Sequence, residues 1–167
     1  MFIQLIIAKS LQLAKRLKFS NLIQPICLAG SFQENGTDER ETAVIAGWGW
    51  YDDSAHVSTT LREGLEHFIN IDVCKKSVPL VDEKLHICGD GTYQHTMQHD
   101  SGCPIFVKSP FSDRRGNPRW MEVGVNDFNS HPDVFTRVST QCEFIKNATK
   151  GEVQCIPMKP LTTNLKK

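Results

Sequence analysis

The heptapeptide Gln98-His99-Asp100-Ser101-Gly102-Cys103-Pro104 is the stretch around which the chain is organised. In it a serine lies between a carboxylate and a glycine, and the apolar run Ile105-Phe106-Val107 follows at once. A nucleophilic serine needs a tight loop that exposes its oxygen, with backbone N–H groups facing a developing oxyanion. Gly102 permits such a loop, because glycine adopts backbone angles that other residues avoid. By itself Asp-Ser-Gly is more often a plain turn, so the surrounding sequence must show whether this is a nucleophile loop.

Composition narrows the class of protein. The chain has 167 residues, 40% of them hydrophobic, and a formal net charge of +0. This length suits one domain with a real core, and the balanced charge argues against a nucleic-acid-binding protein. The 6 cysteines include no CxxC pair, which favours disulfides over a metal site and so predicts an extracellular protein. Asn35 and Asn147 each begin a glycosylation sequon, which fits that location.

The N-terminal stretch Met1–Ala8 is apolar but short, lacks a positively charged start and is interrupted by Lys9. It is a poor signal peptide and too short to span a membrane, so we predict a strand there and no membrane association. We expect that the chain begins within a domain.

The rest of the chain predicts short strands separated by turn signals, which is typical of an all-β sandwich or barrel. Pro25 makes the segment around it extended rather than helical. A helix is expected at the end, over 140–148, with Phe144 and Ile145 facing inward. The tail after Cys155 is expected to be loose. Strands are expected at 2–8, 11–13, 42–50, 61–73, 84–88, 104–108, 120–125 and 134–138, with an extended segment over 23–28, a hairpin loop over 109–118 and a helical turn starting at Cys74.

Five segments, in order, resemble the trypsin-like serine proteases. They are the interdomain segment 17–28, the Gly47-Trp48-Gly49 strand end, the Cys74…Cys88 pair, the Asp100-Ser101-Gly102 loop and the last strand over 132–139. The resemblance implies a chymotrypsin-like fold with two antiparallel β-barrels. This chain would hold the C-terminal barrel and the last strand of the N-terminal one, ending in a helix. We assign 1–150 to a partial protease domain and 151–167 to a C-terminal tail.

The resemblance assigns Ser101 to the nucleophile position. The family's catalytic histidine would precede residue 1, and its aspartate would fall near Ile7, where no acidic residue occurs. The oxyanion-hole N–H groups would belong to His99 and Ser101, although the family has glycine at the His99 position. Asp100 matches the aspartate that pairs with a newly formed N-terminus, and we expect it here to be an unpaired surface carboxylate.

The substrate pocket departs from the family pattern at four positions, which are His95, Asp127, Phe128 and Asp133. His95 stands at the pocket base, so a preference for Lys or Arg is not supported. Asp127 and Phe128 replace the usual Ser-Trp. Asp133 replaces a glycine and would intrude on the cavity, so we expect a filled, inactive pocket.

The resemblance also implies disulfides. Cys74 would pair with Cys88, and Cys27 with Cys142. Cys103 and Cys155 would either pair with each other or leave Cys103 free near the serine.

Two functions remain open at this point. One is a secreted serine endopeptidase acting on protein or peptide substrates, with part of its catalytic machinery outside this chain. The other is a catalytically dead homologue that binds a protein partner. Neither implies a metal or other cofactor.

Overall fold

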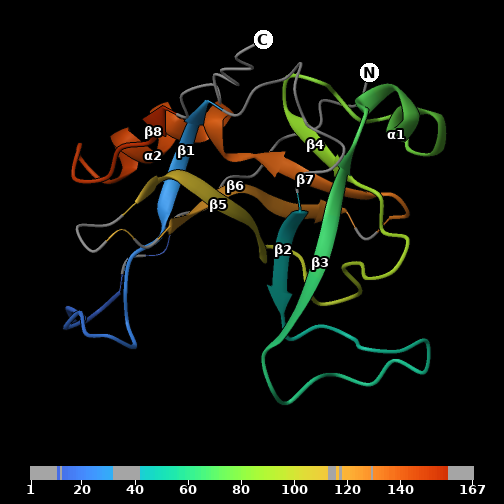
Figure 1. Cartoon of the computed structure of the whole chain (residues 1–167), viewed down its shortest axis with the longest axis horizontal. Coiled ribbons are helices and arrows are strands. Elements are labelled where there is room, and N and C mark those ends of the chain that lie inside the picture. The colour runs from blue at the N-terminus through green and yellow to red at the C-terminus, as the bar shows by residue number, and fades with distance from the viewer. Residues whose placement is uncertain are drawn as a thin grey trace, which may run out of the picture.

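The computed structural model describes residues 11, 13–31, 42–112, 116, 118–128 and 130–157, and it is mostly β (Figure 1). The expected strand over 2–8 and the sequon at Asn35 lie outside the described residues. In chain order the elements are β1 (Cys27–Ser31), β2 (Thr42–Gly47), β3 (Arg62–Ile69), α1 (Ile71–Ser77), β4 (His86–Gly89), β5 (Pro104–Ser112), β6 (Pro118–Phe128), β7 (Asp133–Arg137), a 3₁₀ turn η1 (Val138–Gln141), α2 (Cys142–Ala148) and β8 (Ile156–Pro157).

Six of these strands close into an antiparallel barrel. The strand order is β5-β2-β3-β4-β7-β6, and pairing of β5 with β6 closes the ring. β1 then runs parallel to β6 outside the ring, and β8 pairs with β1. This is the all-β, chymotrypsin-like barrel with a C-terminal helix that the sequence predicts.

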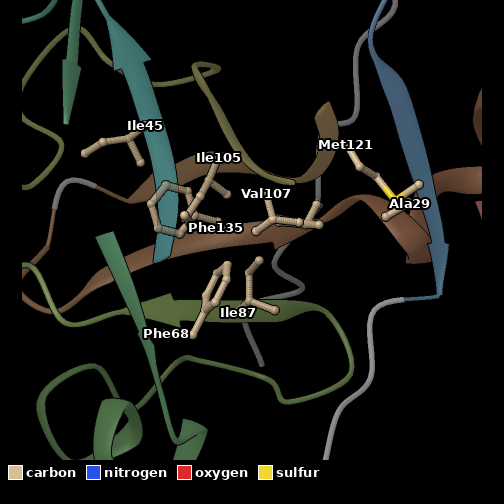
Figure 2. Close-up of a cluster of buried hydrophobic side chains, with 10 residues drawn as sticks. Ala29, Ile45, Phe68, Ile87, Ile105, Val107, Met121 and Phe135 are labelled. Atoms are coloured by element: carbon tan, nitrogen blue, oxygen red, sulfur yellow. The ribbon is translucent and has the colours of Figure 1, made fainter. Parts of the chain in front are cut away.

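The core follows from the alternation of side chains along each strand. Side chains from facing strands meet inside the barrel, where Phe68, Ile105 and Phe135 have no exposed surface (Figure 2). Gly124 on β6 leaves room for them, because a Cβ there would lie 2.9 Å from both Ile105 and Phe135. Close packing in the interior therefore accounts for the large side chains of Phe68, Ile105 and Phe135 and for the glycine at position 124.

Several boundaries differ from the sequence prediction. The strand expected over 61–73 ends at Ile69, and α1 begins at Ile71 rather than at Cys74. The Asn70 side chain accepts a hydrogen bond from the Asp72 N–H (2.7 Å), which caps α1 and stops the strand. The loop expected over 109–118 is shorter, because β5 runs to Ser112 and β6 starts at Pro118.

The last helix also differs from the prediction. The 3₁₀ turn η1 occupies Val138–Gln141, so α2 starts only at Cys142. Ile145 is half-buried, but Phe144 is 40% exposed, so the expectation that Phe144 faces inward is wrong. Asn147 lies exposed near the end of α2.

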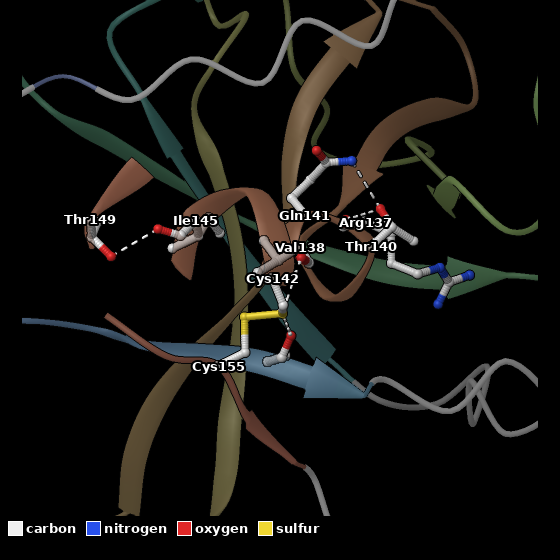
Figure 3. Close-up of a disulfide and its surroundings, with 9 residues drawn as sticks. Arg137, Val138, Thr140, Gln141, Cys142, Ile145, Thr149 and Cys155 are labelled. Atoms are coloured by element: carbon white, nitrogen blue, oxygen red, sulfur yellow. Dashed lines mark hydrogen bonds between the residues drawn. A yellow bond between two sulfur atoms is a disulfide. The ribbon is translucent and has the colours of Figure 1, made fainter. Parts of the chain in front are cut away.

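The disulfides include one pair that the resemblance implies and one that it does not. Cys74 is bonded to Cys88, joining α1 to β4. Cys142 is bonded to Cys155, while Cys27 and Cys103 are free, so the expected Cys27–Cys142 pair is wrong (Figure 3). The Cys103–Cys155 alternative is wrong for the same reason.

As far as Pro157, the segment after α2 is held against the barrel, so the expectation of a loose tail is wrong for these residues. The Cys142–Cys155 bond holds it, and Ile156 and Pro157 pair with Ala29 and Ser31 of β1. Among the described residues, no helix is long and apolar enough to cross a membrane.

Replacing Cys142 and Cys155 together by serine tests this tie. We expect the free energy of unfolding, measured in urea without reductant, to fall by about 3 kcal/mol, because the bond closes a loop of 13 residues. The matched control is Cys27→Ser, which removes a half-buried thiol that is already unpaired, and it should change stability by less than about 1 kcal/mol. Equal losses in the two proteins would contradict the assigned pairing.

Candidate active site

Ser101 lies exposed on a tight turn that is docked onto strand β6. The Cys103 N–H donates to the Asp100 carbonyl (2.9 Å), which closes the turn. The Gly102 N–H donates to the Asn126 carbonyl (2.9 Å), and the Asn126 N–H donates to the Cys103 carbonyl (2.8 Å). Gly102 has a φ of 88°, which favours glycine at this position. The serine is thus presented by a loop of the kind that a nucleophile needs.

His99 precedes this turn in a conformation that a side chain rarely adopts. Its φ is 73°, in the left-handed region where the family's glycine would cost nothing. Its ring lies edge-on to Trp50, with the ring centroids 5.9 Å apart. At the predicted oxyanion-hole position, a histidine therefore has the backbone conformation that glycine would adopt freely, with strain of about 1–3 kcal/mol.

Asp100 is buried and hydrogen-bonded, so the expectation of an unpaired surface carboxylate is wrong. It is 8% exposed. Its Oδ1 accepts a hydrogen bond from the Gly49 N–H (2.8 Å), and its Oδ2 accepts one from the Met97 N–H (3.0 Å). The carboxylate therefore joins the loop after β2 to the loop that carries Ser101.

The Gly47-Trp48-Gly49 motif is explained by this carboxylate. A Cβ at Gly47 would lie 2.1 Å from Asp100 Oδ1, and one at Gly49 would lie 2.5 Å from Oδ2. Such contacts are far inside van der Waals range, so a side chain at either glycine would expel the carboxylate. Trp50 adds a further link, because its N–H donates to the Gln98 carbonyl (2.9 Å).

A cavity of about 270 Å³ lies beside this loop, lined by Asp100, Cys103, Met97 and the strand ends around Gly47 and Gly64. The Cys103 Sγ lies 3.9 Å from Asp100 Oδ1. Burial raises the pKa of the Cys103 thiol, and the nearby Asp100 charge raises it further. The thiol therefore stays protonated at neutral pH and is a poor nucleophile.

The Ser101 hydroxyl has no hydrogen-bond partner among the residues that the structure describes. Its nearest histidine in sequence, His99, turns toward Trp50 instead. His56 is bound to Asp52, with its Nδ1 2.8 Å from Oδ2. Within the described part of the chain, Ser101 therefore lacks the imidazole that would accept its proton.

The four predicted pocket positions have different surroundings. His95 is exposed, with its ring centroid 6.0 Å from that of His131. Asp127 accepts a hydrogen bond from the Thr136 hydroxyl (2.9 Å) and lies 3.5 Å from His86 Nε2. Phe128 ends β6, and its side chain lies outside the described part of the structure. Asp133 is in the interior.

Asp133 has no exposed surface, and its Oδ2 accepts a hydrogen bond from the Thr96 N–H (2.7 Å). Thr96 in turn donates its hydroxyl to the Asn126 side-chain oxygen (3.1 Å). A carboxyl that no water can touch does not line an open pocket. The substitution therefore closes the interior at this position.

Sequence analysis missed a second buried carboxyl, Glu66 on β3. Glu66 has no exposed surface and accepts a hydrogen bond from the Gly91 N–H (2.8 Å), whereas Leu65 is 56% exposed. The signal was available, because Phe68 faces the core and the period of a strand is two residues, which places Glu66 on the same face. No group of three His, Cys, Asp or Glu side chains in the described ranges is arranged to hold a metal ion.

The comparisons with known proteins agree on one family, the trypsin-like serine proteases. A sequence model of the trypsin family matches residues 9–145. The venom serine protease of Polistes dominula is 31% identical over 149 residues, covering 84% of this chain and 51% of that protein. Phenoloxidase-activating enzyme 1 of Spodoptera litura is 27% identical over 143 residues, covering 81% of this chain and 36% of that protein.

Transmembrane protease serine 9 of Rattus norvegicus is 25% identical over 138 residues, covering 77% of this chain and 12% of that protein. The chain thus spans about half the length of the venom protease and less of the other two.

Replacing His99 by glycine tests the strain in the Ser101 loop. We expect the free energy of unfolding to rise by about 1 kcal/mol, because glycine adopts a positive φ without a steric penalty. The matched control is Gln98→Gly, at an exposed neighbour that has no positive φ, and it should lower stability by about 0.5–1 kcal/mol. Urea denaturation measures both, and a loss of stability in His99→Gly would contradict the assigned backbone.

Proposed function

The chain belongs to the trypsin family of serine proteases, and from this premise we propose that it is a non-catalytic member that binds a protein partner outside the cell. Proteins are the substrates of this family, so a protein is the natural ligand of the fold. The paired cysteines and the exposed sequon at Asn147 support an oxidising, glycosylating location. The first relative's description as a venom protease supports the same location.

The burial of Asp133 is the observation that carries this proposal. In an active member, the glycine at this position leaves space for the substrate side chain that the pocket recognises. Here a carboxyl with no exposed surface fills that space and is held by Thr96. A substrate side chain could enter only by displacing both groups. Loss of substrate binding removes the positioning on which acyl transfer depends.

The histidine at position 99, where the family has an oxyanion-hole glycine, supports the same proposal. His99 holds its backbone at a φ of 73° at a cost in strain, so alignment of its N–H is less secure than with glycine. An oxyanion-hole donor that is lost or displaced typically lowers kcat by about 100-fold to 1000-fold.

A second candidate is a serine endopeptidase in which residues outside this chain provide the base. The observation that favours it is the intact support of Ser101. Asp100 is buried and bound to Gly49, and the serine is exposed on a closed turn. The relatives extend well beyond the matched region, which leaves room for such residues in a longer protein.

An active-site phosphonate probe separates the two candidates. We expect the purified chain to be labelled no faster than its Ser101→Ala variant, because no imidazole of the described residues reaches the hydroxyl and Asp133 fills the predicted pocket position. Labelling of the unmodified chain at least about tenfold faster than the variant would overturn the proposal. Circular dichroism and mapping of the Cys74–Cys88 and Cys142–Cys155 bonds establish that both proteins are folded.

A further inference from the structure

Two buried carboxyl groups face each other across strand β4. In the sheet, Phe68 of β3 pairs with Gly89 of β4, and Gly89 pairs with Asp133 of β7. Glu66 lies two residues before Phe68, on the same face of β3. A Cβ at Gly89 would lie 2.5 Å from the Glu66 carboxyl carbon, so the glycine is what lets this side chain cross β4 toward β7. Glu66 and Asp133 are both 0% exposed.

Each carboxyl uses one oxygen to hold the backbone of the same loop. Glu66 Oε1 accepts a hydrogen bond from the Gly91 N–H (2.8 Å), and Asp133 Oδ2 accepts one from the Thr96 N–H (2.7 Å). The two N–H groups lie at the two ends of the segment 91–96, which leads directly into the loop of Ser101. The pair therefore clamps this segment at both ends.

The other oxygen of each carboxyl indicates how the pair is protonated. Glu66 Oε2 and Asp133 Oδ1 are buried, and neither receives a hydrogen bond from an N–H group or a hydroxyl of the described protein. The two carboxyls flank Gly89 closely enough that the charge of Asp133 raises the pKa of Glu66. Two carboxylates both lack a donor, so a hydrogen bond between them requires one proton.

We propose that Glu66 and Asp133 share a single proton, and that this proton acts as a pH-dependent latch on the segment 91–96 that leads to Ser101. With the proton in place, both carboxyls are satisfied and both ends of the segment are held. Without it, two adjacent negative charges lie in the interior, and separating them requires the segment to move. The inference does not depend on whether Ser101 is catalytic.

The groups around the pair determine the pH at which the latch opens. Burial raises the pKa of Glu66 to about 8, while the Gly91 N–H acts in the opposite direction. Charges on Asp133 and on Asp90 raise the pKa of Glu66 further.

Burial likewise raises the pKa of Asp133, against the hydrogen bond from Thr96 and the charge of His95. Two more imidazoles lie close to Asp90 and His95. His67 Nδ1 lies 4.0 Å from Asp90 Oδ2, and the His131 ring centroid lies 6.0 Å from that of His95.

The sign of the stability change follows from the raised pKa of Glu66. Its ordinary value is 4.5, so an unfolded chain loses this proton near that pH while the folded chain keeps it until about pH 8. The stabilisation by the shared proton is therefore complete below about pH 4.5 and is lost as the pH rises through about 8.

Glu66→Gln tests the latch, because an amide keeps the acceptor for Gly91 and offers an N–H to Asp133 but has no proton to lose. Relative to this variant, the unfolding equilibrium constant of the unmodified chain should rise about tenfold per pH unit between about pH 5.5 and 7.5. The matched control is Glu63→Gln, an exposed carboxyl on the same strand, which should keep the unmodified slope. Equal slopes in the unmodified chain and Glu66→Gln would overturn the proposal.

A titration by NMR keeps the proposal testable if Glu66→Gln does not fold. The Gly91 and Thr96 amide resonances of the unmodified chain should shift together with one apparent pKa near 8. In Asp133→Asn, the asparagine N–H stabilises ionised Glu66, so that shift should move at least about one pH unit lower. Gly91 and Thr96 shifts that stay unchanged in Asp133→Asn would overturn the shared proton.

Discussion

Buried carboxyl groups that accept backbone N–H hydrogen bonds are the constraint on which the Ser101 region depends. Residues 90–103 form neither helix nor strand, so Gly91, Thr96 and Met97 have no regular backbone partner for their N–H groups. Glu66, Asp100 and Asp133 supply the missing acceptors to Gly91, Met97, Gly49 and Thr96. Leaving a buried donor unpaired costs about 1–3 kcal/mol, so this loop is ordered by side chains that the barrel brings to it.

The fold could be predicted largely because it rests on local patterns. Alternation of apolar residues and turn signals predicted most of the strands and a sandwich or barrel, and the family resemblance of five spaced motifs implied the barrel. The errors arose where a single side chain, as a helix cap or as a buried carboxyl, departed from the apolar alternation. Asn70 caps α1 and ends β3 early, and strand register turns Glu66 inward in place of Leu65. A charged residue in the core is unfavourable by itself, and it is accepted here because Gly89 gives it space and Gly91 gives it a donor.

The site was harder to predict, because its key contacts join distant segments. Asp100 had no visible partner in sequence, and its acceptor role depends on Gly49, which lies 51 residues away. The Cys142–Cys155 bond likewise depends on the chain turning back after α2, which no pattern in the tail indicated. By contrast, the residue types at His99 and Asp133 pointed to a departure from the family, because each replaces a glycine.

The return of the chain to β1 has a consequence for the behaviour of the protein in solution. Ile156 and Pro157 pair with Ala29 and Ser31, on the side of β1 away from β6. A strand at the margin of a sheet offers unpaired backbone groups to other molecules and so invites aggregation. Here the chain covers part of that margin with its own residues, the second of them a proline that cannot donate a hydrogen bond onward. The bond from Cys155 thus holds in place the segment that covers this margin.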